Sequence, residues 1–128
     1  MILNTDSTKP IYIQIAEWIE EEILNGTFEK GEKVYSQYAL AEMYTINPAT
    51  AAKGLNILSD ENILFNKRGL GKFVADHAIE IITKKRKDKN LKGLVKEIVL
   101  EAERLNVNED ELVVMIKSFM NERKGETE

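Results

Sequence analysis

The stretch that decides the fold runs from Pro10 to Val74 and reads PIYIQIAEWIEEEILNGTFEKGEKVYSQYALAEMYTINPATAAKGLNILSDENILFNKRGLGKFV. Apolar residues such as Ile15 and Ile23 recur in its first part at the spacing of one helix face. Pro10 suits a first helical turn because its missing N–H group needs no partner there. We therefore predict a helix that begins at Pro10 and stops at Gly26.

Two further helix starts follow in the same stretch. Ser36 can cap a short helix. Asn47 followed by Pro48 predicts a helix over residues 48–59, because asparagine caps free N–H groups and proline has the backbone angle of a first helical residue. Gly54 in its middle costs about 1 kcal/mol relative to alanine, which indicates close approach to a neighbouring helix. The predicted inward stripe of this helix consists of Ala51, Leu55 and Leu58.

The residues after the third predicted helix indicate a β-hairpin. Residues 63–67 and 72–75 have the pattern of two short strands, and Gly69 and Gly71 between them permit the positive φ values of a tight turn. Three helices followed by such a hairpin is the order of a winged helix-turn-helix, in which the helix after the tight turn enters the DNA major groove. We therefore expect a mainly α-helical fold with a small β-hairpin as the wing.

Beyond the hairpin the sequence predicts a second region made of helices. Apolar residues continue at helical spacing as far as Leu105, and Asn108 with Glu111 forms a capping box for a last helix. We therefore divide the chain into a winged helix-turn-helix domain over residues 1–76 and a C-terminal pair of helices over residues 77–128.

The apolar rows of this helix pair are expected to form a dimer interface. If the two helices were isolated, these apolar rows would form a large exposed patch, which is unusual for a soluble monomer. A two-fold partner would cover it and would space two DNA-reading domains about one DNA turn, roughly 34 Å, apart. Docking of the helices onto the winged domain is the alternative. The residues expected at the dimer interface are Leu94, Ile98, Leu105, Leu112, Met115, Ile116 and Phe119.

Composition argues against several classes of protein. The 128 residues include no cysteine and one histidine, which excludes disulfides, thiolate zinc sites and histidine clusters. No apolar run is long enough to span a bilayer and no secretion signal is recognisable, so we expect a cytoplasmic protein without a membrane partner. Paired carboxylates, an activated nucleophile and a phosphate-binding loop are missing, so we expect neither enzymatic activity nor a cofactor.

The formal net charge of −4 is unusual for a protein that neutralises DNA phosphates, but the charges are sorted by region. Glu17 and Glu20–Glu22 are interpreted as a solvated helix face. Basic residues gather instead in the predicted wing and in the run Lys84–Lys89. That run can either contact the DNA flank or form a solvated helix face, and the solvated face is the favoured interpretation.

Several separate motifs in the quoted stretch resemble the GntR family of bacterial regulators nearly end to end. Asn47-Pro48 and the short helix pair resemble its YtrA-like branch, whose members dimerise through two such helices. This resemblance implies a transcription regulator, acting as a repressor of a transporter-type operon, that binds a palindromic operator as a homodimer. It implies no room for a conventional ligand-binding domain, and the sequence assigns no small-molecule effector. The matching positions are Pro10, Tyr12, Gln14, Ile15, Gly26–Gly31, Ser36, Leu40, Ala41, Arg68, Gly69, Gly71, Phe73 and Val74.

The same resemblance implies which residues would contact DNA. Ser36 would touch the sugar-phosphate backbone, the helix over residues 48–59 would enter the major groove, and the wing would lie near the minor groove. Thr50 could meet either a base edge or a phosphate. The full set expected to contact DNA is Ser36, Tyr38, Ala49, Thr50, Lys53, Lys67, Arg68, Gly69, Gly71 and Lys72.

Some positions depart from the family pattern. Tyr38, Pro48 and Ala52 stand where the family commonly has arginine, so bidentate reading of guanine is lost there. Lys72 replaces a usual threonine and adds a charge to the wing. Fewer arginines predict weaker DNA affinity per monomer and more reliance on dimerisation. The acidic total charge and the missing arginines also support an alternative function, in which the winged helix is an interaction module that contacts protein instead of DNA.

Overall fold

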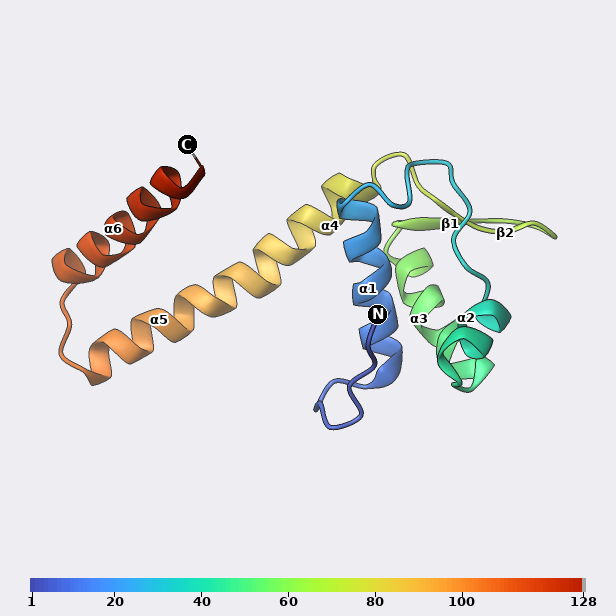
Figure 1. Ribbon diagram of the computed structural model, residues 1–128, viewed down its shortest axis with the longest axis horizontal. Coiled ribbons are helices and arrows are strands. Elements are labelled where there is room, and N and C mark those ends of the chain that lie inside the picture. The colour runs from blue at the N-terminus through green and yellow to red at the C-terminus, as the bar shows by residue number, and fades with distance from the viewer. Residues whose placement is uncertain (128) are drawn as a thin grey trace. The chain divides into compact units, whose positions relative to one another are not determined.

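The structure is a computed structural model that describes residues 1–127, and it divides into two compact units, Met1–Lys85 and Arg86–Glu128 (Figure 1). The predicted fold class, mainly α-helical with a small β-hairpin, is confirmed. The elements in chain order are α1 (Ile11–Leu24), α2 (Gln37–Tyr44), α3 (Pro48–Asp60), β1 (Leu64–Lys67), β2 (Gly71–Val74), α4 (Ala78–Arg86), a π-helix (Lys87–Leu91), α5 (Lys92–Arg104) and α6 (Glu109–Thr127).

The first unit extends beyond residue 76, where the sequence suggested a domain boundary. Ala78 and Ile82 of α4 are 1% and 0% exposed, and they belong to the same apolar core as α1 and α3. Removal of these apolar side chains from water stabilises the fold, and they are removed from water by packing against the core of the first unit. The start of α4 is therefore part of the winged-helix unit and not of the C-terminal helix pair.

The helix starts expected at Ser36 and Asn47 are present and capped, whereas α1 begins at Ile11, one residue after the predicted start at Pro10, and has no side-chain cap. Ser36 Oγ accepts a hydrogen bond from the Ala39 N–H at 3.1 Å, and Asn47 Oδ1 accepts one from the Ala49 N–H at 2.8 Å. Each bond satisfies an N–H group that the first helical turn leaves unpaired. Thr45 between α2 and α3 has a left-handed backbone with a φ of 52°, which produces the tight turn of a helix-turn-helix.

The core of the first unit lies between α1 and α3 and is closed by the hairpin and α4. The inward stripe predicted for α3 is confirmed, since Ala51, Leu55 and Leu58 are at most 2% exposed. This stripe leaves the opposite side of α3 free of core contacts. The other fully buried large apolar side chains of the unit are Ile15, Ile19, Ile23, Leu40, Ile63, Leu64, Val74 and Ile82.

Gly54 allows α1 and α3 to approach closely, as its position in mid-helix predicted. A Cβ atom built at Gly54 would lie 2.8 Å from the carbonyl oxygen of Tyr12 and 3.2 Å from the side chain of Ile15. Since a backbone carbonyl cannot rotate away as a side chain can, any larger residue here must push the two helices apart.

We expect Gly54→Ala to lower the free energy of unfolding by about 1–2 kcal/mol. Overpacking costs about 1–3 kcal/mol, and the 2.8 Å approach to a backbone oxygen favours the upper half of that range, about 2–3 kcal/mol. The better helix propensity of alanine offsets about 1 kcal/mol of it. Urea denaturation followed by circular dichroism measures the change. Gly93→Ala in α5 is the matched control, because a Cβ there meets nothing within 4 Å. A Gly54→Ala variant as stable as wild type would contradict the packing argument.

The wing is an antiparallel pair of strands whose register places Lys67 opposite Gly71. Its turn is closed by a 2.9 Å hydrogen bond from the Leu70 N–H to the Lys67 carbonyl. Gly69 and Gly71 have φ values of 77° and 116°, a region that favours glycine because it has no Cβ. The tight glycine turn expected from the sequence is therefore present.

The helical pattern after the wing is not one uninterrupted α-helix as expected, because a π-helix over Lys87–Leu91 separates α4 from α5. Asn106 follows α5 with a φ of 59°. The cap predicted for the last helix is present, since Asn108 Oδ1 accepts a hydrogen bond from the Glu111 N–H at 2.9 Å. None of the helices within residues 1–127 has the length and apolar content needed to cross a membrane.

Candidate nucleic-acid interface

The start of α2 presents a hydroxyl group and an aromatic ring to solvent. Because Ser36 Oγ acts as an acceptor toward the Ala39 N–H, its own O–H remains able to donate to a phosphate oxygen. Tyr38 is 70% exposed. Both residues are in the set predicted to contact DNA, and both are exposed to solvent.

The solvent side of α3 carries small side chains around one lysine. Ala49 and Lys53 are exposed, and Thr50 is half-buried. Lys53 is the only basic residue in α3, so the helix presents a single positive charge. Short neighbouring side chains let such a helix come close to base edges, and the Thr50 hydroxyl can donate to or accept from either a base or a phosphate.

Lys53 does not extend freely into solvent. Its ammonium nitrogen lies 4.0 Å from the centroid of the Tyr12 ring, which is the geometry of a cation–π contact. Sequence reasoning noted Tyr12 only as a position shared with the GntR family and missed its contact with Lys53. The signal that could have found it is Gly54, whose close approach to α1 brings the neighbouring Lys53 beside Tyr12.

The wing gathers exposed cations from two parts of the chain. Lys67 and Arg68 are exposed, and the Lys67 ammonium lies 4.5 Å from the centroid of the Phe73 ring. Lys33, from the connection between α1 and α2, pairs with Phe73 as an isolated bridge, and its side chain passes close to Gly71. Sequence reasoning missed Lys33, because no local pattern indicates a pairing between residues so far apart.

Lys72 differs from the other predicted contacts because its ammonium is already engaged. It donates to Ser59 Oγ at 2.8 Å and to Asn66 Oδ1 at 2.7 Å. Burial lowers the pKa of Lys72, and the nearby Asp60 carboxylate offsets only part of that effect. Two of the three N–H donors of Lys72 are therefore used within its own unit, and one remains for a contact with DNA.

The interpretation of Glu20 as part of a solvated face is wrong. Glu20 is 2% exposed and accepts a hydrogen bond from Lys85 at 2.7 Å, while Glu61 accepts a second one at 2.8 Å. Burial by itself lowers the pKa of Lys85, but its hydrogen bonds and charge interactions with the two carboxylates outweigh burial and raise the pKa. Lys85 of the basic run is thus an internal ion-pair partner, neither a solvated cation nor one available to DNA.

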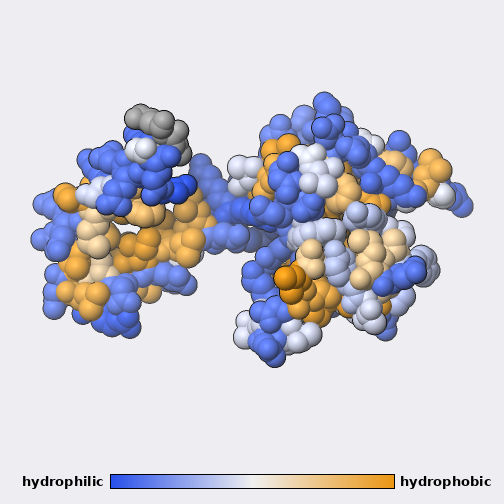
Figure 2. All heavy atoms as spheres, viewed as in Figure 1, coloured by the Kyte–Doolittle hydropathy of each residue, from blue (hydrophilic) through white to orange (hydrophobic). Residues whose placement is uncertain are grey.

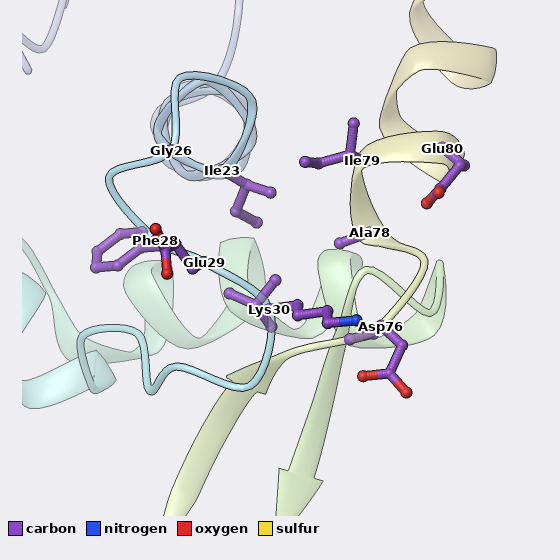
Figure 3. Close-up of a pocket in the computed structure, with 11 residues that line it drawn as sticks. Ile23, Gly26, Phe28, Glu29, Lys30, Asp76, Ala78, Ile79 and Glu80 are labelled. Carbon is purple, nitrogen blue, oxygen red and sulfur yellow. The ribbon is translucent and has the colours of Figure 1, made fainter.

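A groove of about 470 Å³ lies in the first unit, away from the DNA-contact set (Figure 3). Its walls come from the end of α1, the connection after it and the start of α4, and they include Ile23, Phe28 and Ile79. Figure 3 shows the Lys30 side chain directed toward Asp76. None of the lining residues belongs to α2, α3 or the turn of the wing, so this groove is separate from the surface described above.

A helix-turn-helix with α3 exposed, followed by a two-stranded wing with exposed cations, defines a winged-helix DNA-binding protein. The family described as "Bacterial regulatory proteins, gntR family" matches residues 11–74, which is half of the 128-residue chain. The chain therefore belongs to the GntR family, and it is a DNA-binding transcription regulator and not an enzyme.

Individual relatives agree with this assignment. The HTH-type transcriptional repressor YtrA of Bacillus subtilis is 29% identical over 96% of this chain and 94% of its own length. A GntR-family transcriptional regulator from Bacteroides thetaiotaomicron, solved as a crystal structure, is 30% identical with a TM-score of 0.76 and covers 89% of this chain and 99% of that one. BusR of S. agalactiae, solved with its busAB promoter DNA, is 30% identical with a TM-score of 0.54 and covers 91% of this chain and 58% of that one.

Proposed function

We propose that this regulator is a repressor that binds a palindromic operator as a homodimer. Repression is supported by similarity to a protein named as a repressor over nearly the whole of both chains. The resemblance of Asn47-Pro48 and the C-terminal helix pair to the YtrA-like branch supports a transporter-type operon as the target. A repressor of chromosomal genes acts in the cytoplasm, which is where we place the protein.

The proposed DNA contacts divide by groove. In the major groove, α3 would place Lys53 against a base edge or phosphate, with Thr50 and Ala49 beside it. The N-terminus of α2 would contact the sugar-phosphate backbone through its capping hydroxyl and its exposed ring. The wing would lie near the minor groove, where negative potential attracts cations and glycines allow close backbone approach. The residues proposed outside the major groove are Ser36, Tyr38, Lys67, Arg68, Gly69, Gly71 and Lys72.

The observation that supports a homodimer is the lack of a core in the second unit. Among the described side chains of this unit, Ala102 alone is buried. Figure 2 shows apolar side chains gathered along α5 and α6. A second copy of the same surface would cover them. Of the predicted interface residues, Leu112 is half-buried, and Leu94, Ile98, Leu105, Met115, Ile116 and Phe119 are between 44% and 64% exposed.

Selection of genomic DNA fragments with the purified full-length protein, followed by footprinting, tests the proposal. We expect protection of two half-sites about one DNA turn, roughly 34 Å, apart. Affinity should fall steeply between about 50 and 200 mM salt, because bound lysines release counterions from the phosphates. Salt-insensitive binding, or binding to no genomic fragment above random duplex, would contradict it. Increased expression of the bound operon when the gene is deleted supports repression, and decreased expression contradicts it.

We expect Lys53→Ala to weaken operator binding about tenfold, since a lysine contact to a base or phosphate contributes about 1–3 kcal/mol. If Lys53 binds a phosphate, the slope of log affinity against log salt should also fall by about one. Lys30→Ala is the matched control, because Lys30 is also exposed but lies outside the proposed interface. Equal effects of the two substitutions would argue against α3 as the reading helix.

A further inference from the structure

Lys53 is held by an aromatic ring and not by a carboxylate. Its ammonium lies 4.0 Å from the Tyr12 ring centroid, and among the described residues it forms no ion pair within 4 Å. Tyr12 belongs to the first turn of α1 and is half-buried, so its ring has less freedom than an exposed side chain. The only cation of α3, Lys53, therefore contacts an aromatic ring that belongs to a different helix, α1.

The contact follows from the way α1 crosses α3. Gly54 brings the α3 backbone against the Tyr12 carbonyl, where an added Cβ would lie 2.8 Å away. Lys53 directly precedes Gly54, so its side chain leaves α3 next to the crossing and reaches the ring. Apolar burial on both helices maintains this spacing, because Ile15 of α1 and Leu55 of α3 are at most 2% exposed.

The chemistry of the contact suits a lysine that must bind an anion. A carboxylate partner would neutralise the ammonium and would have to be given up on DNA binding. An aromatic face attracts the cation through its quadrupole and occupies one side only, so N–H donors remain for phosphate or base acceptors. A restrained lysine also has less side-chain entropy left to lose when it binds.

We propose that Tyr12 is a positioning residue for DNA binding, whose ring holds the Lys53 ammonium toward DNA and stays beneath it in the complex. The inference rests on the proposed role of α3 as the reading helix. It predicts that the ring of Tyr12, and not its hydroxyl, contributes to operator affinity, and that this contribution depends on Lys53.

A double-mutant cycle on operator binding by the full-length protein tests the inference. Tyr12→Leu should weaken binding about fivefold when Lys53 is present and less than about twofold in the Lys53→Ala background. Tyr12→Phe keeps the ring and should bind within about twofold of wild type. A purely structural role of Tyr12 predicts equal losses in both backgrounds, and a hydroxyl contact to phosphate predicts a loss in Tyr12→Phe; either result overturns the inference.

Proton NMR of the wild-type protein provides a measurement that needs no substitution. The Lys53 methylene resonances should be shifted upfield by the Tyr12 ring current both in the free protein and in the operator complex. Loss of this shift on DNA binding, or tighter binding by Tyr12→Leu, would mean that the ring competes with DNA for the ammonium, and it overturns the inference. An unchanged affinity of Lys53→Ala overturns the role of Lys53 itself, whereas a loss in Lys53→Ala with none in Tyr12→Leu overturns only the positioning role.

Discussion

Phe119→Glu is expected to make the protein monomeric in solution and to weaken operator binding by at least about 100-fold. Two linked DNA-binding units gain about 10²–10⁴ in affinity over one, and this gain is lost when the link is broken. Phe119 is 63% exposed in the single chain, so a charge there is solvated in the monomer. In a two-fold interface Phe119 would be buried in both copies. Its replacement by glutamate would remove about 2–3 kcal/mol of apolar burial from each copy.

Phe119 suits this test because the fold of the single chain does not depend on it. The groove of about 490 Å³ between α5 and α6 is lined from α6 by Leu112 and Met115, and not by Phe119. Val114→Glu is the matched control, since Val114 is 61% exposed on the same helix and lies outside the predicted interface set. Analytical ultracentrifugation and quantitative footprinting provide the two readouts.

The outcomes separate the alternatives for the helix pair. A dimeric wild type, a monomeric Phe119→Glu variant and a dimeric Val114→Glu variant support the proposed interface. A monomeric wild type at micromolar concentration would contradict the homodimer and favour docking of the helix pair onto the winged domain. A dimeric Phe119→Glu variant with wild-type affinity would exclude Phe119 from the interface.

Lys85→Met is expected to lower the free energy of unfolding of the first unit by about 3 kcal/mol. Removal of one partner from a buried ion pair costs about 3–5 kcal/mol, because the buried charge that remains loses a charge-assisted hydrogen bond. Glu20 is 2% exposed, whereas the Lys85 side chain is 24% exposed, so partial solvation of the pair favours the lower end of that range. Urea denaturation measures the difference, and Lys87→Met, at an exposed position, is the control.

The contribution of Lys85 should also depend on pH in a defined direction. Its carboxylate partners raise its pKa in the folded state above the ordinary value of 10.5. The stability that it provides is therefore fully present below pH 10.5 and is lost as the pH rises through the raised value. The stability difference between wild type and Lys85→Met should stay constant from about pH 7 to about pH 10 and shrink above that. A difference that grows with pH in this range would contradict the ion-pair explanation.

Local sequence was sufficient to predict the order and type of the elements up to the wing and the start of the last helix, but not the π-helix over Lys87–Leu91. Ser36, Asn47-Pro48 and Asn108 mark helix starts because a cap acts through hydrogen bonds to N–H groups two or three residues away. Gly69 and Gly71 mark the wing because positive φ values restrict the choice of residue at one position. Such signals need no knowledge of the rest of the chain, and the winged helix-turn-helix follows from them.

Only the tertiary structure decided what the charged residues of this DNA-binding regulator do. Lys85 and Glu20 are 65 positions apart in the sequence, and a charge run by itself cannot indicate that one of its members is paired in the interior. The Lys53 contact with Tyr12 and the Lys72 bonds to Ser59 and Asn66 likewise depend on how separate elements meet. Backbone caps act over a few residues, whereas the surroundings of a long charged side chain are set by whichever elements the fold brings beside it.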